Sequence, residues 1–149
     1  MYNDYSREMI GDEEKERTAR EPEDRGGEAS CEGRVVMNAA AFQAFMTGST
    51  SGTSEAWTVA RLAGILGAKQ ADKHILVSHS FNIAGIEMEY EADEAGNHVT
   101  VRCRVRTKER TGAETAALVG CGMALMALVD SLRAIDRGMT IDGLRIVRQ

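Results

Sequence analysis

Two segments in which apolar and polar residues alternate constrain the fold of this chain more than any other feature. In residues 86–91 apolar side chains alternate with glutamates, and in residues 99–106 they alternate with threonine and arginines. Residues 93–97 between them have the composition of a turn. A period of two is typical of a strand with one buried face. The pattern therefore predicts a β-hairpin with one side turned to water.

The other apolar segments predict helices and two further strands. Residues 34–37 read as a short strand, and Asn38 is a suitable N-cap for a helix over 39–46. A second helix is expected from Ser54 to about Lys69, and a long one over about 113–136, ended by Gly138 as the C′ glycine. Residues 144–147 complete the set as a last strand. The order β-α-α-β-β-α-β favours an α+β fold, with helices on one face of a largely antiparallel sheet.

The acidic residues are concentrated at the N-terminus. Residues 1–32 contain 11 acidic and 5 basic side chains, a balance of −6, whereas the whole chain of 149 residues has a net charge of −5. We expect an acidic, largely flexible segment over residues 1–32, with an acidic interaction arm as the alternative, and a single domain over 33–149. The isoelectric point near 5.3 and the lack of an aromatic platform argue against nucleic-acid binding.

The lengths of the apolar segments and the number of cysteines indicate the cellular compartment of the protein. The longest uncharged run, residues 115–129, is shorter than the roughly 20 residues that cross a bilayer, and the N-terminus lacks a signal-peptide pattern. The three cysteines are odd in number and widely spaced, without close Cys/His pairing. We expect a cytoplasmic protein with reduced thiols, no membrane span, no metal site and no cofactor.

Four side chains are candidates for chemistry, and each has a simpler structural explanation. His79 directly precedes the first hairpin strand, where loops often carry functional groups, although a lone histidine is more commonly a packed or surface residue. Glu114 lies in the first turn of the long helix, where a carboxylate favours the helix dipole. Asp130 and Arg133 are three residues apart on the same helix and can form an ordinary ion pair.

A basic cluster follows the second hairpin strand. It allows two interpretations of equal weight: pairing with glutamates 87, 89 and 91 across the hairpin, or binding of phosphate. The cluster consists of Arg102, Arg104, Arg106, Lys108 and Arg110.

Residues 55–65, 77–81, 110–114 and 129–135, in this order and spacing, resemble the molybdenum cofactor biosynthesis protein C family, the cyclic pyranopterin monophosphate synthases. The resemblance covers about residues 9–149. It implies a ferredoxin-like α+β fold that forms dimers and a hexamer as a trimer of dimers. It also implies a cytoplasmic lyase that converts a cyclised dihydro-GTP intermediate to cyclic pyranopterin monophosphate with release of pyrophosphate. Its partners are then a small-molecule nucleotide or pterin substrate and further copies of the chain.

The resemblance also implies roles for individual residues. His79 matches the family's histidine, Glu114 its first glutamate and Asp130 its helix aspartate, with Arg133 in the place of its helix lysine. Arg20 looks like the arginine that meets the substrate triphosphate. The remaining arginines expected to bind substrate phosphate are Arg61, Arg106 and Arg110.

The chain departs from the family pattern at several positions. Thr53 falls at a family lysine, Ala116 at its second glutamate, and Ser78 and Ser80 flank the histidine in place of cysteine and proline. Arginine and threonine are poor proton acceptors compared with a buried lysine. The alternative is therefore a diverged paralogue that keeps the oligomer and a phosphate- or pterin-binding pocket but lacks this reaction or catalyses another.

The spacing of Glu114 and Asp130 carries a geometric prediction of its own. Sixteen residues on one helix separate them by roughly 24 Å along the axis and about 160° around it. If both residues serve one site, that site is shared by two chains across a two-fold axis, which predicts an isologous dimer. Small residues at the helix centre are expected to allow close approach of the neighbour: Gly120, Gly122, Ala124 and Ala127.

Overall fold

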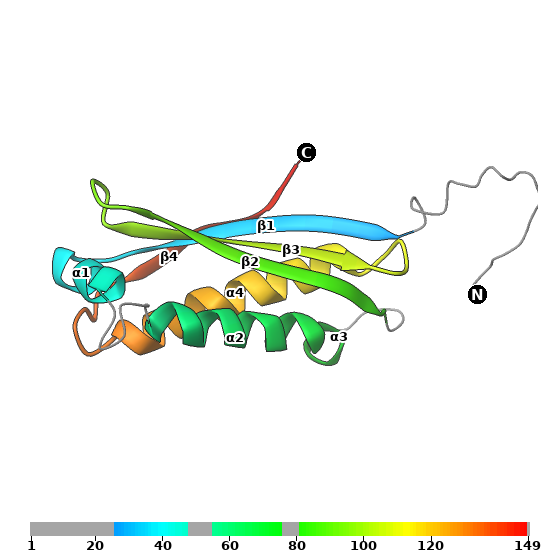
Figure 1. Cartoon of the computed structure of the whole chain (residues 1–149), viewed down its shortest axis with the longest axis horizontal. Helices are drawn as coiled ribbons and strands as arrows, with labels where there is room; N and C mark the ends of the chain where they lie inside the picture. The colour runs from blue at the N-terminus through cyan, green and yellow to red at the C-terminus, as the bar shows by residue number, and fades with distance from the viewer. Residues whose placement is uncertain (1–25, 48–54, 76–80, 149) are drawn as a thin grey trace, which may run out of the picture.

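The computed structural model describes residues 26–47, 55–75 and 81–148. They form a four-stranded antiparallel sheet with the helices on one face (Figure 1). The elements in chain order are β1 (Gly27–Val36), α1 (Ala39–Thr47), α2 (Glu55–Lys69), α3 (Ala71–His74), β2 (Ile83–Asp93), β3 (His98–Thr107), α4 (Ala113–Leu132) and β4 (Thr140–Val147).

The strand order is β2-β3-β1-β4, and all neighbouring strands are antiparallel. The predicted hairpin is confirmed as β2 and β3, with Glu87 opposite Arg104 and Glu89 opposite Arg102. If the helices between β1 and β2 are taken as one connection, the order β-α-β-β-α-β corresponds to a ferredoxin-like arrangement. The prediction of an α+β fold with helices on one face is thus confirmed.

The core lies between the sheet and the helices α2 and α4. Every second residue of β3 is buried, from Val99 to Thr107, because the alternating strand turns its apolar side towards the helices. α4 runs beneath the sheet and buries residues along most of its length (Figure 1). Its buried side includes Ala113, Ala116, Ala117, Gly120, Cys121, Ala124, Leu125, Leu128 and Leu132.

Glycines allow α2 and α4 to pack closely within one chain. A Cβ on Gly120 would lie 3.0 Å from the carbonyl oxygen of Gly64 and 3.1 Å from the Cβ of Ala68. A Cβ on Gly64 would in turn lie 3.2 Å from the Cβ of Ala124. The expectation that Gly120 and Ala124 face a neighbouring chain is therefore wrong, because α2 of the same chain occupies that side.

Two predicted boundaries also differ from the structure. β1 begins at Gly27 rather than at Arg34, so residues 27–32, which we assigned to the acidic segment, pair with β3. Glu28 and Glu32 lie on the exposed side of this strand. Because they continue the acidic composition of the preceding residues, the alternation of buried and exposed side chains in the strand is not recognised from the sequence. α4 ends at Leu132 with Arg133 as its C-cap, so Gly138 is not the C′ glycine.

A hydrogen-bonded junction joins the end of α4 to the start of α1. The predicted N-cap is confirmed, since the Ala41 amide donates to Asn38 Oδ1 at 2.8 Å. The carboxylate of Asp136 accepts hydrogen bonds from the amides of Asn38 at 2.7 Å and of Gly138 at 2.8 Å. This nearly buried carboxylate therefore fixes the α4–β4 connection against the β1–α1 connection.

By length and apolar composition α4 qualifies as a candidate membrane span, and 44% of its most apolar window is buried inside the molecule. A core helix of a water-soluble domain meets the same criteria. In this structure α4 packs against the sheet and lies beside α2 on the same face of the sheet.

Candidate functional site

A cavity of about 350 Å³ opens at the N-terminal end of α4. The loop between β3 and α4 forms one wall, and Glu28 of β1 contributes the other. The loop turns into the helix at Gly112, whose φ of 95° lies in the left-handed region that favours glycine. The lining residues are Glu28, Arg110, Thr111, Gly112, Ala113, Glu114 and Thr115.

The cavity combines one cation, two carboxylates and the positive end of a long helix. Glu114 lies in the first turn of α4, and Arg110 lies in the loop directly before it. A helix N-terminus attracts anionic groups, and an arginine can bind phosphate oxygens through two parallel hydrogen bonds. The arrangement can therefore bind a phosphorylated molecule beside a carboxylate that is able to accept a proton.

Two of the predicted phosphate-binding arginines belong to this end of the molecule. Arg110 lines the cavity itself. Arg106 is the register partner of Glu28, and Gly85 leaves room for its guanidinium, because a Cβ there would lie 2.3 Å from Nη2. Arg106 forms no ion pair with another residue that the structure describes, so its charge is available at this edge.

Asp130 and Arg133 lie at the opposite end of α4. They form an exposed ion pair with 3.0 Å between Asp130 Oδ1 and Arg133 Nη2, as the spacing predicted. Neither side chain lines the cavity near Glu114, and neither does Arg61 of α2. Since α4 is continuous from Ala113 to Leu132, one chain keeps Glu114 and Asp130 apart by about 24 Å.

Several predicted residues lie outside the described ranges: Arg20, Thr53, Ser78, His79 and Ser80. Phe81, two residues after His79, packs on the loop that lines the cavity. A Cβ on Gly112 would lie 2.4 Å from Phe81 Cδ2. The chain that follows His79 thus reaches the start of α4.

For two members of the basic cluster, the structure decides between the two interpretations of equal weight. Arg104 pairs with Glu87 across the hairpin at 2.5 Å and with Glu28 at 3.6 Å. Arg102 pairs with Glu91 at 3.1 Å and with Glu32 at 3.2 Å. Cross-strand pairing is therefore confirmed for Arg102 and Arg104.

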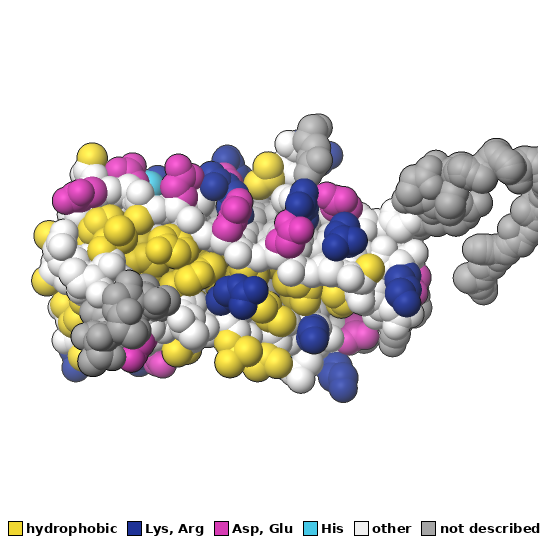
Figure 2. Space-filling model, in the orientation of Figure 1, with side chains coloured by type: hydrophobic (Ala, Val, Ile, Leu, Met, Phe, Trp, Pro, Cys, Tyr) yellow, Lys and Arg dark blue, Asp and Glu magenta, His cyan; other side chains and the backbone are white. Residues whose placement is uncertain are grey.

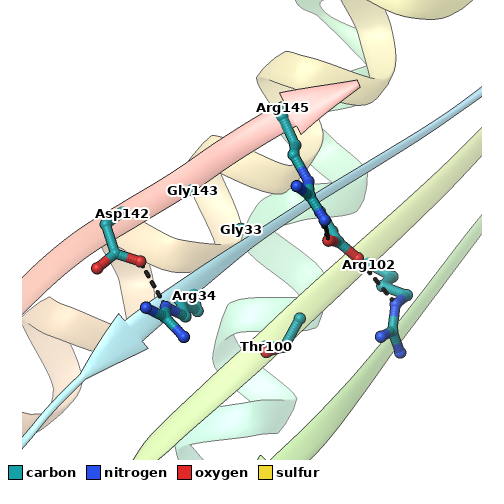
Figure 3. A pocket seen from close by; sticks show the side chains of 8 residues that line it. Gly33, Arg34, Thr100, Arg102, Asp142, Gly143 and Arg145 are labelled. Carbon is teal, nitrogen blue, oxygen red and sulfur yellow. Dashed lines mark hydrogen bonds and ion pairs between the residues drawn. The ribbon is translucent and has the colours of Figure 1, made fainter. Parts of the chain in front are cut away.

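A second cavity, of about 410 Å³, lies on the exposed face of the sheet over β1, β3 and β4 (Figure 3). Arg34 pairs with Asp142 at 2.6 Å, and the Glu32 carboxylate lies between Arg102 and Arg145. The hydrogen bond from Arg145, followed by that from Arg102, holds the pKa of Glu32 below its ordinary value. Its lining holds three arginines and two carboxylates, and the ion pairs with Asp142 and Glu32 engage all three arginines.

The three cysteines lie together in the core between β1, β3 and α4. Cys31 and Cys103 are register partners, and Cys121 Sγ lies 3.5 Å from the carbonyl oxygen of Val101. All three are free and buried. Burial raises the pKa of Cys31 to about 11 and the pKa values of Cys103 and Cys121 to about 12. The thiols therefore stay protonated at neutral pH and are poor nucleophiles.

Within the described part of the chain, no group of three or more His, Cys, Asp or Glu side chains has the arrangement to hold a metal ion. Sequence reasoning missed Glu28 as a cavity residue. The alternation of Glu28 with the apolar Ala29 and Cys31 is a sign of a β-strand, but the many acidic residues around it led us to assign this stretch to the acidic segment.

Comparison with known proteins identifies relatives along most of the chain. The model of the MoaC family matches residues 13–149. A cyclic pyranopterin monophosphate synthase of Chloroflexus aggregans is 34% identical over 120 residues, which cover 80% of this chain and 72% of the relative. A protein of the same name from Bordetella pertussis is 34% identical over 118 residues, which cover 79% of this chain and 73% of the relative. Another from Heliobacterium modesticaldum is 31% identical over 122 residues, which cover 82% of this chain and 76% of the relative. The chain belongs to the MoaC family.

Proposed function

We propose that this chain is a cyclic pyranopterin monophosphate synthase of molybdenum cofactor biosynthesis. It converts a cyclised dihydro-GTP intermediate to cyclic pyranopterin monophosphate and releases pyrophosphate. The observation that carries the proposal is the cavity in which Glu114 and Arg110 lie together at the N-terminus of α4, in a chain whose relatives bear this enzyme's name.

Each end of the site has a separate task in this proposal. Arg110 and Arg106 bind the triphosphate, together with Arg20 and Arg61, and the positive end of α4 adds to the attraction. Glu114 and His79 orient the pterin and transfer protons. Asp130 and Arg133 come from a neighbouring copy, because their own α4 holds them far from Glu114.

The exposed side of the helical layer supports an assembly of several copies. Hydrophobic side chains gather along α2 (Figure 2). Val59, Leu62 and Leu66 of α2 are 50–57% exposed, and Met126 of α4 is 53% exposed. Contiguous exposed apolar side chains are typical of protein–protein interfaces. We therefore include a homodimer, assembled into a hexamer in the cytoplasm, in the proposed function.

Release of pyrophosphate from the cyclised dihydro-GTP intermediate tests the proposal. The purified chain is expected to release pyrophosphate well above background. Glu114→Gln removes the proton acceptor but keeps the shape, and should lower kcat by about 10²-fold to 10⁴-fold. Glu94→Gln, in the β2–β3 turn, is the matched control and should leave the rate unchanged. Absence of release by the parent protein rules out this function.

A diverged paralogue is the second candidate, and the observations that favour it are Thr53, Ala116 and Arg133. Ala116 is fully buried in the core, so a glutamate there would place a carboxylate among apolar side chains of the same chain. Arg133 stays protonated and cannot act as a base. If this candidate is correct, Thr53→Lys combined with Arg133→Lys creates activity that the parent lacks. An active parent contradicts it.

A further inference from the structure

We propose that Glu109 is a positioning residue that holds the wall of the cavity at α4 in its binding shape by clasping Asn82. Glu109 is not among the residues that line the cavity, so its effect runs through its neighbours in the loop. The hydrogen-bonded clasp is inferred from the structure alone. Its expected effect on activity rests on the proposed function.

The two carboxylate oxygens of Glu109 bind one residue in two places. Oε1 accepts a hydrogen bond from the Asn82 backbone amide at 2.8 Å, and Oε2 accepts one from Asn82 Nδ2 at 2.9 Å. A charged acceptor makes such bonds about twice as strong as neutral ones, and two parallel bonds fix orientation as well as distance. The side chain of Glu109 therefore has one geometry relative to the start of β2.

Two further hydrogen bonds, from the residues just before Glu109, strengthen the attachment. The Lys108 amide donates to the carbonyl oxygen of Asn82 at 3.0 Å. The hydroxyl of Thr107 donates to the carbonyl oxygen of Glu109 at 2.7 Å. The loop thus begins from a backbone fixed both to β2 and to the end of β3.

The other end of the loop is held by the residue next to Asn82. Phe81 packs against Gly112, so residues 81 and 82 contact the loop at Gly112 and at Glu109. Arg110 and Thr111 lie between these two contacts, and both line the cavity. Release of the clasp at Glu109 therefore frees the stretch that carries Arg110, whereas the core and α4 keep their packing.

The clasp requires a carboxylate opposite an amide, which suggests an exchange of the two groups. Glu109→Gln removes the charge of the acceptor, and it keeps two contacts only as weaker neutral bonds after the Asn82 amide rotates to present its oxygen. Asn82→Asp places two carboxylates opposite each other. Each single change therefore weakens or breaks the clasp. In the combined variant the introduced amide donates to the introduced carboxylate and still accepts from the backbone amide of residue 82. The pair is then restored with its partners exchanged.

The experiment compares the parent, both single variants, the combined variant and Glu94→Ala, an exposed turn carboxylate, as the control. Amide hydrogen exchange of residues 108–112 measures how firmly the loop is held. The kcat and KM for pyrophosphate release measure the function of the site. Each single change should speed exchange in this loop several-fold and lower kcat/KM by about 10-fold to 100-fold, because misplacement by about 1 Å is costly. The unfolding midpoint should stay close to that of the parent, and the combined variant should recover both readouts.

Unchanged exchange and kcat/KM in the single variants overturn the proposal, as does a combined variant no better than the singles. Faster exchange over the whole chain with a lower unfolding midpoint means that Glu109 is merely structural. Asn82→Ala removes the same side-chain bond without adding charge and gives a second test if Asn82→Asp fails to fold. A parent protein that releases no pyrophosphate contradicts the proposed function. The hydrogen-exchange rates of the loop in the single and combined variants then still show whether the clasp holds the loop.

Discussion

At the residue scale, single carboxylates and thiols determine how parts of this chain are held together. Asp136 is 9% exposed and accepts two backbone hydrogen bonds that join the ends of α4 and β1. No sequence pattern predicted this role, because Asp136 lies in a region that we assigned to the long helix. Partners 98 residues apart in the sequence become neighbours only through the fold.

Asp136→Ala leaves the amides of Asn38 and Gly138 without their acceptor and should lower the free energy of unfolding by about 1–3 kcal/mol. Urea denaturation measures the change. Glu94→Ala, which removes an exposed carboxylate in a turn, is the control and should change stability by less than about 0.5 kcal/mol. Equal effects of the two substitutions would show that the junction contributes no stability.

The buried thiols predict a loss of stability at alkaline pH. Their pKa values in the folded chain, about 11 for Cys31 and about 12 for Cys103 and Cys121, exceed the ordinary value of 9.0. Between these values the unfolded chain releases protons that the folded chain retains, so stability is full below pH 9 and falls as pH rises towards 11–12. Urea unfolding from pH 8 to 11 measures the slope.

Cys103→Ala is the comparison variant for this alkaline effect. Because it removes one of the titrating thiols, its stability should fall less steeply above pH 9 than that of the parent, even if it is lower at pH 8. A thiol reagent should label the folded parent slowly and the unfolded chain fully. Parallel pH profiles for parent and variant contradict the assignment.

At the element scale, local patterns predicted what each segment does on its own. Asn38 as N-cap, the start of α2 at Glu55 and the hairpin all follow from side chains close together in the sequence. The start of β1 and the end of α4 depend on pairing with distant segments, and the prediction missed both. The prediction also missed the partner of the small residues of α4. Their spacing predicts a closely packed neighbour but does not show whether that neighbour is α2 or a second chain.

Two neighbouring glycines of α4 provide a matched pair. Gly120→Ala places a Cβ 3.0 Å from the Gly64 carbonyl oxygen and 3.1 Å from Cys103 Sγ, so α2 and the sheet must give way. We expect a loss of about 1–3 kcal/mol. Gly122→Ala places its Cβ 3.7 Å from Leu144, an ordinary contact, and should be neutral or gain up to about 1 kcal/mol from helix propensity.

Thermal and urea unfolding of the two variants measure this difference. The expected order of stability is Gly122→Ala at or above the parent, with Gly120→Ala below it. The reverse order would show that the close contact of α2 and α4 within one chain is not what Gly120 serves.

At the scale of the whole molecule, the residues of the proposed site lie at the two ends of α4. The sequence predicted Glu114, Arg110 and the Asp130–Arg133 pair, and their placement follows from helix geometry. The contributions of Glu28 and Glu109 depend on strand register and loop contacts, which the sequence does not contain. In the proposed function, a complete site requires a second copy that brings its Asp130 end to the Glu114 end of the first.

Mixing of two inactive variants tests this shared site most directly. Glu114→Ala and Asp130→Ala are each expected to lose pyrophosphate release. When the two variants are unfolded together and refolded as mixed oligomers, some sites contain neither substitution. The account predicts that activity returns to about one quarter of the parent's value in equimolar mixtures, since half the pairs are mixed and each mixed pair has one intact site. Confirmed mixed oligomers that remain inactive, or a monomeric parent with full activity, would contradict it.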